Sequence, residues 1–187
     1  MKKIISLILV ALCMFSMVAC GQQTGNSEDA LNQMMNGKFI IDDKEYFVDG
    51  IHEQLITDGW ITVGEDHMLE SKCETILFYF HEDYGTDITN FHISVSYFNN
   101  SDESKKIIEC DVSTIRFKEA RKKCPKFGVE PNVVYGKTTN KIKKICSPTL
   151  IESNLWKYKG TESTKVKQLI IDFGKNDKLE AIELSFK

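Results

Sequence analysis

The sequence predicts an α+β fold, with an antiparallel sheet that carries short helices on one face. Eleven phenylalanines and an apolar fraction of 42% supply enough side chains for a core. Residues 89–98 alternate, with Phe91, Ile93, Val95 and Tyr97 on one side and mostly polar side chains on the other, which is typical of a half-buried antiparallel strand. The helical patterns are short and are followed by runs of strands, an order that favours an α+β architecture.

The first expected elements are a hairpin and a short helix. Residues 38–41 and 45–48 are rich in strand formers and flank the polar turn 42–44. Residues 51–58 place apolar side chains on one helical stripe, and Gly59 stands where a helix commonly ends.

Further strands are expected in the middle of the chain. Residues 60–63 are strand-like, and residues 75–81 are almost entirely apolar or aromatic, which indicates a strand buried on both faces or at an interface. Residues 107–117 predict one or two more strands. The basic segment 118–126 is either a short helix or a connection.

The C-terminal part predicts a second helix and three closing strands. A helix over residues 140–146 turns Ile142 and Ile145 inward, and Thr138 or Thr139 is a suitable N-cap. A hairpin turn joins the last two strands. The three strands are expected at residues 154–158, 165–173 and 179–186.

A helix followed by about three strands thus occurs twice, over residues 51–98 and 139–186. This order suggests two helix-plus-three-strand repeats, although residue identity between them is poor. We expect one domain over residues 37–187, divisible into halves 37–117 and 118–187.

The two parts of the chain differ strongly in charge. Residues 20–104 carry 17 acidic side chains and three lysines, a net charge of −14, whereas residues 105–187 have a net charge of +9. Either the two regions pack against each other, or the basic region meets an anionic partner such as phospholipid headgroups or an anionic wall polymer. Salt would screen such an attraction. No motif supports nucleic acid as a partner.

The N-terminus has the features of an export signal. Lys2 and Lys3 precede an apolar run over residues 4–19, which is shorter than the roughly 20 residues of a membrane span and suits a signal peptide. Residues 17–20, Met-Val-Ala-Cys, resemble the lipobox of bacterial lipoproteins. The resemblance implies cleavage before Cys20 and a diacylglyceryl group, with palmitate among its expected acyl chains, on the thiol.

Lipidation would place the domain outside the cytoplasm, anchored to the bacterial cell membrane. Two acyl chains hold a protein stably on a bilayer because each buried CH₂ contributes about 0.8 kcal/mol. Residues 1–19 are then a lipoprotein signal peptide, and the polar residues 20–36 are a tether.

Four cysteines fall inside the expected domain. An even number in an exported domain is compatible with disulfides, in any of three connectivities, and free buried thiols are an equal alternative. Their spacing contains no C-x-x-C pair, so a zinc site is not predicted. The four are Cys73, Cys110, Cys124 and Cys146.

No sequence pattern predicts a catalytic or metal site. The four histidines lie in different expected elements without metal-binding spacing, and residues 83–87 beside His81 are more simply a turn than a calcium site. Residues 136–139 match only the end of a phosphate-binding loop, because Pro131 occupies its first glycine position. No serine lies in a G-x-S-x-G motif. We therefore expect no enzymatic activity, cofactor or metal.

Aromatic side chains offer one candidate binding surface. Most of them should be core, but Phe98 falls on the otherwise polar side of its strand. If Tyr79, Phe98 and Trp156 are exposed together, they would form a protein-binding patch.

An ordered series of motifs fills the C-terminal half. In chain order these are residues 135–139 (Tyr-Gly-Lys-Thr-Thr), Ile142 and Ile145 of the short helix, Pro148, residues 156–158 (Trp-Lys-Tyr), residues 169–173 (Leu-Ile-Ile-Asp-Phe) and residues 178–182 (Lys-Leu-Glu-Ala-Ile). The series resembles the repeat of β-lactamase-inhibitor-like domains and of the small lipoproteins of outer-membrane assembly. The chain also resembles a group of Gram-positive lipoproteins, through residues 39–46 and the pair Gly59-Trp60. The resemblance implies a helix-and-sheet scaffold whose concave face binds protein, without catalytic residues.

These features predict a membrane-anchored extracytoplasmic lipoprotein that acts as a non-catalytic scaffold for another cell-surface protein or for a surface polymer. The alternative is an exported enzyme or a metal-dependent ligand-binding protein that uses the acidic N-terminal half. Convergence of Asp83, Asp87 and a histidine in one pocket would favour that alternative.

Overall fold

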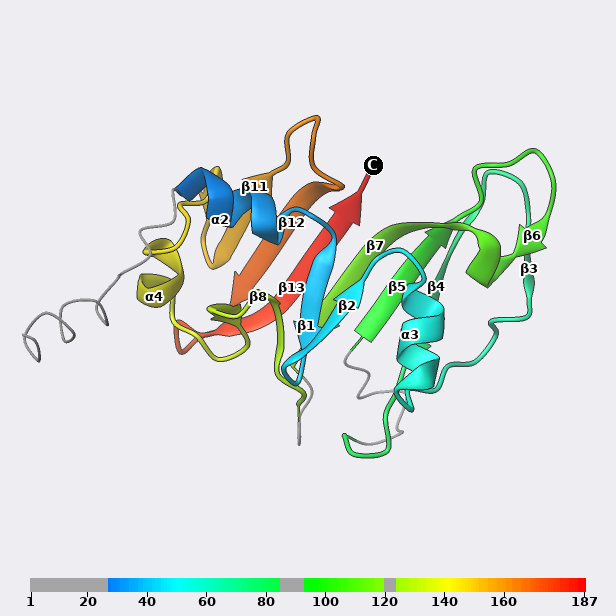
Figure 1. Cartoon of the computed structure of the whole chain (residues 1–187), viewed down its shortest axis with the longest axis horizontal. Helices are drawn as coiled ribbons and strands as arrows, with labels where there is room; N and C mark the ends of the chain where they lie inside the picture. Colours follow the sequence, from blue (N-terminus) through cyan, green and yellow to red (C-terminus); the bar gives the residue numbers. More distant parts are fainter. Residues whose placement is uncertain (1–26, 85–92, 120–123) are drawn as a thin grey trace, which may run out of the picture.

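The computed structural model describes residues 27–84, 93–119 and 124–187. Its largest element is an antiparallel sheet of seven strands, in the order β10-β11-β12-β13-β7-β5-β4 (Figure 1). The predicted α+β class, dominated by antiparallel sheet with a few short helices, is confirmed. The strands of this sheet are β4 (Glu74–Tyr79), β5 (Ile93–Phe98), β7 (Asp111–Lys118), β10 (Leu150–Glu152), β11 (Leu155–Lys159), β12 (Val166–Phe173) and β13 (Leu179–Phe186).

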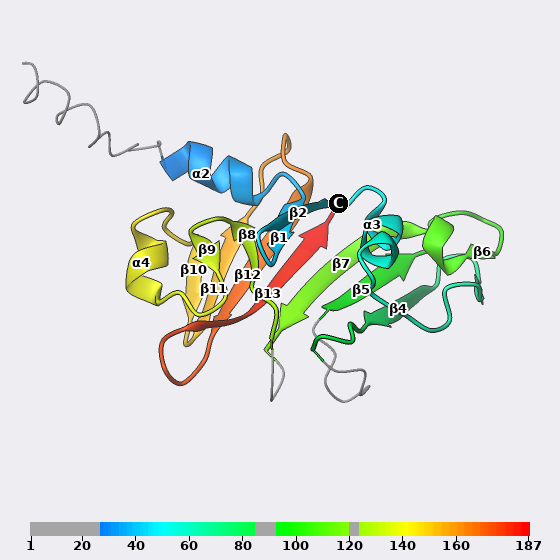
Figure 2. The same ribbon diagram turned by 60° about the horizontal axis from the view of Figure 1, so that its bottom comes forward.

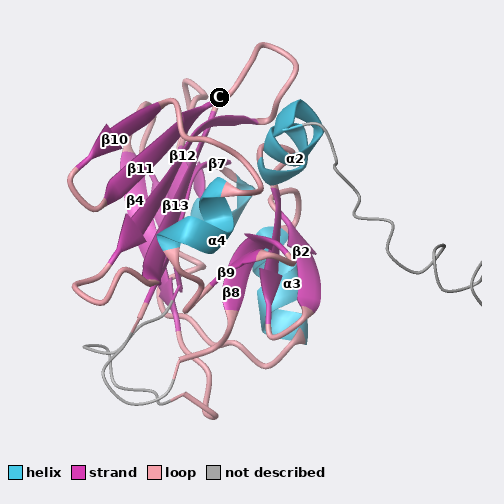
Figure 3. Ribbon diagram, turned by 90° about the vertical axis from the view of Figure 1, so that its left-hand side faces the viewer, coloured by secondary structure: helices cyan, strands magenta, loops and turns pink. Residues whose placement is uncertain are grey.

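A second layer lies against one face of the large sheet. It contains a four-stranded sheet in the order β2-β1-β8-β9, and the helices lie on the same side (Figure 3). The two-residue strands β3 (Met68–Leu69) and β6 (Lys105–Lys106) pair at one end of the molecule. The other elements are β1 (Lys38–Ile41), β2 (Lys44–Phe47), β8 (Phe127–Glu130), β9 (Val133–Val134), α2 (Ser27–Met34), α3 (Ile51–Thr57), α4 (Thr139–Lys143) and a 3-10 helix, Ile107–Glu109.

Buried and more exposed side chains alternate along the strands of the large sheet, which distinguishes its two faces. In β5, Ile93, Val95 and Tyr97 are buried, whereas the residues between them are half-buried. The same alternation continues in β12 and β13. Because alternate side chains of a strand point to opposite faces, one face of the sheet is packed into the core and the other is not.

Two pairings between distant segments close the architecture. The last strand, β13, pairs with β7 in the middle of the large sheet, with Ile182 opposite Phe117 and Leu184 opposite Ile115. In the second sheet, β1 pairs with β8. Both sheets therefore contain strands from the N-terminal and the C-terminal part of the chain.

Three aromatic rings join the two sheets. Phe117 of β7 lies with its ring centroid 5.0 Å from that of Phe39 on β1 and 5.6 Å from that of Phe127 on β8. All three side chains are fully buried. Such rings bury large apolar areas and hold each other in defined geometry, so they fix the distance and orientation between the layers.

Local backbone preferences explain the first turn. The hairpin β1–β2 turns through Asp42 and Asp43, whose φ angles are 47° and 67°. A two-residue turn with positive φ at both positions matches the twist of the flanking strands, and aspartate tolerates this region better than most residues. The predicted hairpin is confirmed. Gly59, with a φ of 85°, follows α3 in the position that favours glycine.

The predicted tether is wrong over its second half. Residues 27–34 form α2, and its last residue, Met34, and the following Met35 are fully buried. The backbone N–H of Val166 on β12 donates to the carbonyl of Met35 at 3.1 Å. The folded domain therefore includes residues from Ser27 onward. The segment is polar in composition, but the two methionines at its end belong to the core.

Several other expected elements differ from the structure. Residues 60–63 form no strand and contribute one bridge, from Ile61 to Phe80. Strand β4 is an edge strand rather than one buried on both faces, since Ile76 is 49% exposed. Strand β10 was not expected. Most of segment 118–126 lies at a strand end or outside the described residues.

Candidate functional site

The outward face of the seven-stranded sheet has no described element packed over it (Figure 3). The strand registers define which side chains share this face. One row crosses five neighbouring strands, each residue opposite the next, from Ile170 to Glu183, Arg116, Ser94 and Phe78. We call this surface the outer sheet face.

Short hydroxyl side chains fill the centre of the outer sheet face. Ser96 pairs with Thr114, and Thr114 pairs with Ser185 across three adjacent strands. Ser94 stands in the next row, opposite Arg116. Because these side chains are small, the centre of the sheet is low in relief and offers hydroxyl donors and acceptors to a partner.

The margin of the outer sheet face at β4 is apolar. Ile76 is 49% exposed, and Phe78 and Phe98 are half-buried on the same face. Beside them, Arg116 Nε lies 3.9 Å from a carboxylate oxygen of Glu183, with about half of the Arg116 side chain exposed. Aromatic and arginine side chains beside a polar field are the composition of protein interfaces.

The structure separates the three residues of the predicted aromatic patch. Tyr79 is fully buried and Trp156 is 6% exposed, both on the covered face of the sheet, whereas Phe98 lies on the outer sheet face. The predicted patch of Tyr79, Phe98 and Trp156 is therefore wrong as a surface. Tyr79 and Trp156 occupy the covered-face positions of β4 and β11. Because alternate side chains of a strand point to opposite faces, the second layer buries both of them.

A cleft of about 500 Å³ opens between α3 and the end of the large sheet. Figure 2 shows α3 lying near β5 and β7 at this end. Its walls include Asp49, Glu53, Asp111 and Lys165, and Lys165 Nζ forms an ion pair with Asp49. The cleft therefore carries both charge signs at its walls.

A chain of hydrogen bonds leads from the cleft into the core. His52 Nδ1 lies 3.0 Å from the hydroxyl of Tyr79, which lies 3.0 Å from the hydroxyl of Tyr97. Burial raises the pKa of Tyr97 to about 12 and raises that of Tyr79 further. Both phenols stay protonated at neutral pH, so they act as hydrogen-bonding groups and not as bases.

Cys110 lines the same cleft. Its thiol lies 3.3 Å from the carbonyl oxygen of Lys106, and burial raises the pKa of the thiol. Because the thiolate is the nucleophilic form of cysteine, this thiol is held in its less reactive form.

The described histidines do not belong to a metal-binding cluster. Among the residues that the structure describes, no three His, Cys, Asp or Glu side chains are grouped so that they could hold a metal ion. His81 Nδ1 lies 3.7 Å from a carboxylate oxygen of Asp83, and Asp87 lies outside the described residues. The rings of Trp60 and Tyr84 pack against the His81 ring, so His81 is part of an aromatic packing cluster.

Cys73, Cys110 and Cys146 are free thiols. Cys73 and Cys110 flank β5 on opposite sides, since Cys73 accepts a hydrogen bond from Asn99 and Cys110 precedes β7. The two cysteines are therefore two strand spacings of about 4.8 Å apart. This separation exceeds the roughly 7 Å that is the upper limit for the Cα–Cα distance of a disulfide. Cys20 lies outside the described residues.

None of the described helices combines the length and the apolar character needed to cross a bilayer. No protein-family model, no curated protein and no solved structure matches the chain.

Proposed function

We propose that this protein is a membrane-anchored extracytoplasmic lipoprotein that binds another cell-surface protein through the outer sheet face, without catalysis. The observation that carries the proposal is the sheet itself. One face of seven strands is packed under a second layer, and the other face presents small hydroxyl side chains beside an apolar margin.

The dimensions of the outer sheet face support a protein partner. Seven strands at about 4.8 Å spacing give a width of about 30 Å. Five of these strands have six to eight residues, which at about 3.3 Å per residue gives a length of about 20 Å or more. A surface of this size suits the roughly 800 Å² that each partner buries in a specific complex.

The order of elements supports a scaffold built from two repeats. A hairpin, a helix and a strand meander occur first as β1–β2, α3 and β4-β5-β7, and again as β8–β9, α4 and β11-β12-β13. The two meanders meet through their last strands, and the two hairpins through their first strands. We infer a two-repeat scaffold of the kind seen in β-lactamase-inhibitor-like domains and small assembly lipoproteins. The chain also resembles Gram-positive lipoproteins through residues 39–46 and the pair Gly59-Trp60.

The membrane anchor in the proposal derives from the N-terminal sequence. Lys2 and Lys3, the apolar run over residues 4–19 and Cys20 after Ala19 are the features expected of a lipoprotein signal. Acylation of Cys20 would confine the domain, and hence its partners, to the cell surface.

A binding role rather than catalysis is supported by the groups around the cleft. Its phenols and the thiol of Cys110 are held protonated by burial. An exported enzyme or a metal-dependent binder that uses the acidic N-terminal half stays the alternative. Such a protein would require a deprotonated nucleophile or a set of metal ligands, whereas burial favours the protonated form of the Cys110 thiol and of the phenols.

Site-specific photocrosslinking in intact cells tests the proposed interface. A benzoylphenylalanine at Ile76 or at Arg116, both on the outer sheet face, is expected to give the same discrete adduct, because one partner would cover both positions. Gel electrophoresis of the membrane fraction after irradiation measures the adduct.

Ile56 on α3 and Phe47 on β2 are matched controls, since they are 41% and 50% exposed but lie in the other layer. These positions are expected to give no such adduct. Equal adducts at all four positions, or no adduct from Ile76 and Arg116, would contradict a partner on the outer sheet face.

A further inference from the structure

We propose that the end of the domain formed by α4 and the β12–β13 turn rests on the anionic phospholipid headgroups of the membrane. We call this surface the basic end. The inference rests on the proposed lipid anchor and adds an orientation to it. The lipid would hold the domain at the membrane, and the lysines of the basic end would orient that end toward the bilayer.

Hydrogen bonds fix the basic end as one unit. The Thr139 hydroxyl at the start of α4 donates to a carboxylate oxygen of Asp177 in the β12–β13 turn at 2.6 Å. The backbone N–H of Leu179 donates to the carbonyl of Lys137 at 2.9 Å, and Thr138 forms a bridge with Lys178. The helix and the turn therefore present their side chains on a common surface.

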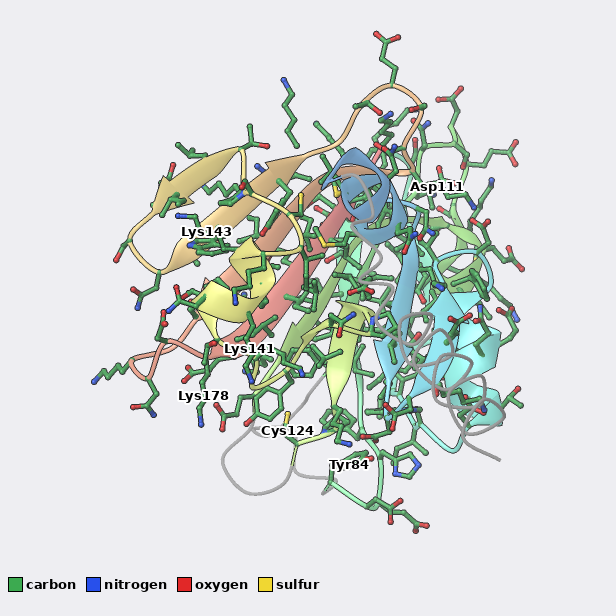
Figure 4. All side chains as sticks on the ribbon, turned by 60° about the vertical axis from the view of Figure 1, so that its left-hand side comes forward. Tyr84, Asp111, Cys124, Lys141, Lys143 and Lys178 are labelled. Carbon is green, nitrogen blue, oxygen red and sulfur yellow. The ribbon has the colours of Figure 1, made fainter. Side chains whose placement is uncertain are left out.

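Five exposed lysines belong to this unit. Figure 4 shows Lys141, Lys143 and Lys178 on the same side of the molecule, around α4 and the β12–β13 turn. Ile142 between the helix lysines is fully buried, which turns its neighbours outward. The five are Lys141, Lys143, Lys144, Lys175 and Lys178.

Few acids offset these charges. In the part of the chain that the structure describes, none of the five lysines forms an ion pair. Two carboxylates lie in the same unit: Asp177, which accepts the Thr139 hydroxyl, and Glu180, which packs over Gly174. The surface therefore has a net positive charge and is complementary to a negatively charged bilayer.

The opposite end of the domain differs in this respect. There, Lys72 lies 3.3 Å from Asp102 and Lys106 lies 3.4 Å from Asp66. At the β3–β6 end, Lys72 and Lys106 are therefore paired with acids, whereas the five lysines of the basic end are not. The molecule has a charge polarity along its long axis.

The chain enters the domain at the basic end. Figures 1 and 2 place α2, which begins at Ser27, on the side of α4 and far from β6. A lipid on Cys20 would lie only seven residues before Ser27, a reach of at most about 25 Å. A short tether thus brings the unpaired lysines to the headgroups, where anionic lipids attract basic side chains.

Vesicle flotation of a lipid-free segment tests this surface separately from the anchor. Residues 27–187 contain every buried residue of the described core, from Met34 to Leu184, so this segment has the parts needed to fold. It is expected to float with vesicles of phosphatidylglycerol and phosphatidylcholine, to remain unbound with phosphatidylcholine alone, and to dissociate as NaCl is raised.

Two triple variants with the same loss of charge locate the contact. K141Q/K143Q/K144Q is expected to weaken vesicle binding about 100-fold, because each lysine contributes roughly fivefold near an anionic surface. K72Q/K105Q/K106Q, at the opposite end, is expected to leave binding within about twofold. Circular dichroism checks that both variants are folded.

Equal losses in the two variants would overturn the proposal, because they would show a response to net charge alone. Binding to a soluble poly(glycerol phosphate) but not to the anionic vesicles would also overturn it, in favour of a wall polymer. The mass of the mature N-terminus is independent of either result, so failure of the basic end and failure of the lipid anchor are distinguishable.

Discussion

Replacement of Phe117 by alanine is expected to lower the free energy of unfolding by about 3–5 kcal/mol. The Phe117 ring is fully buried and packs against Phe39 of β1 and Phe127 of β8. Truncation would remove this buried ring and leave a cavity where the two sheets meet. Urea unfolding followed by circular dichroism measures the change.

Phe47→Ala, on the four-stranded sheet against which Phe117 packs, provides the control. Phe47 lies on β2 and is 50% exposed, so its removal is expected to change the unfolding free energy by less than about 1 kcal/mol. A loss for F117A as small as that for F47A would contradict the packing of the four-stranded sheet against the large sheet.

Iodoacetamide is expected to alkylate Cys73 at least about 100-fold faster than Cys146 in the folded protein. Cys73 is exposed, whereas Cys146 is 4% exposed. Burial also raises the pKa of the Cys146 thiol, which lowers the thiolate fraction. Mass spectrometry of peptides from timed reactions measures both rates.

Cys110 adds a pH dependence to the same experiment. Because burial raises its thiol pKa, its alkylation rate is expected to keep rising with pH beyond the usual range of a thiol. In urea, all four thiols are expected to react at similar rates. A pair that resists alkylation in urea until a reductant is added would reveal a disulfide and contradict the free thiols of Cys73, Cys110 and Cys146.

Alternating patterns were the most predictive part of the sequence. The inward residues of β5, and the strands at residues 165–173 and 179–186, were expected from period-two alternation, and the structure contains them. The hairpin at Asp42-Asp43 was also expected, because its turn chemistry is local. Elements that depend on neighbouring residues alone can be read from a single sequence.

Elements that depend on distant partners were not predictable in this way. The apolar segment around β4 indicated a strand buried on both faces or at an interface, and the first alternative is wrong because β4 lies at the sheet edge with Ile76 exposed. Nothing in β4 itself specifies which strand lies beyond it. The helix α2 was missed for a similar reason, because the core that buries Met34 and Met35 includes distant segments: α2 contacts β8, and Val166 on β12 donates to the carbonyl of Met35.

The outer sheet face also needed the structure. Ser94, Thr114 and Ser185 are unremarkable in the sequence and become one surface only through the β5-β7-β13 pairing. The outward position of Phe98 was the available clue. Tyr79 and Trp156 were wrongly joined to it, because residue type alone does not say which face of a sheet a side chain occupies.

Mass spectrometry of the mature N-terminus tests the central claim most directly. Protein extracted from the membrane fraction of its host is expected to begin at Cys20, with residues 1–19 removed and a diacylglyceryl group on the thiol. That result would fix the outer sheet face at the cell surface. An unmodified Cys20 with residues 1–19 still attached, or a lipid-free protein in the cytosol, would contradict the account.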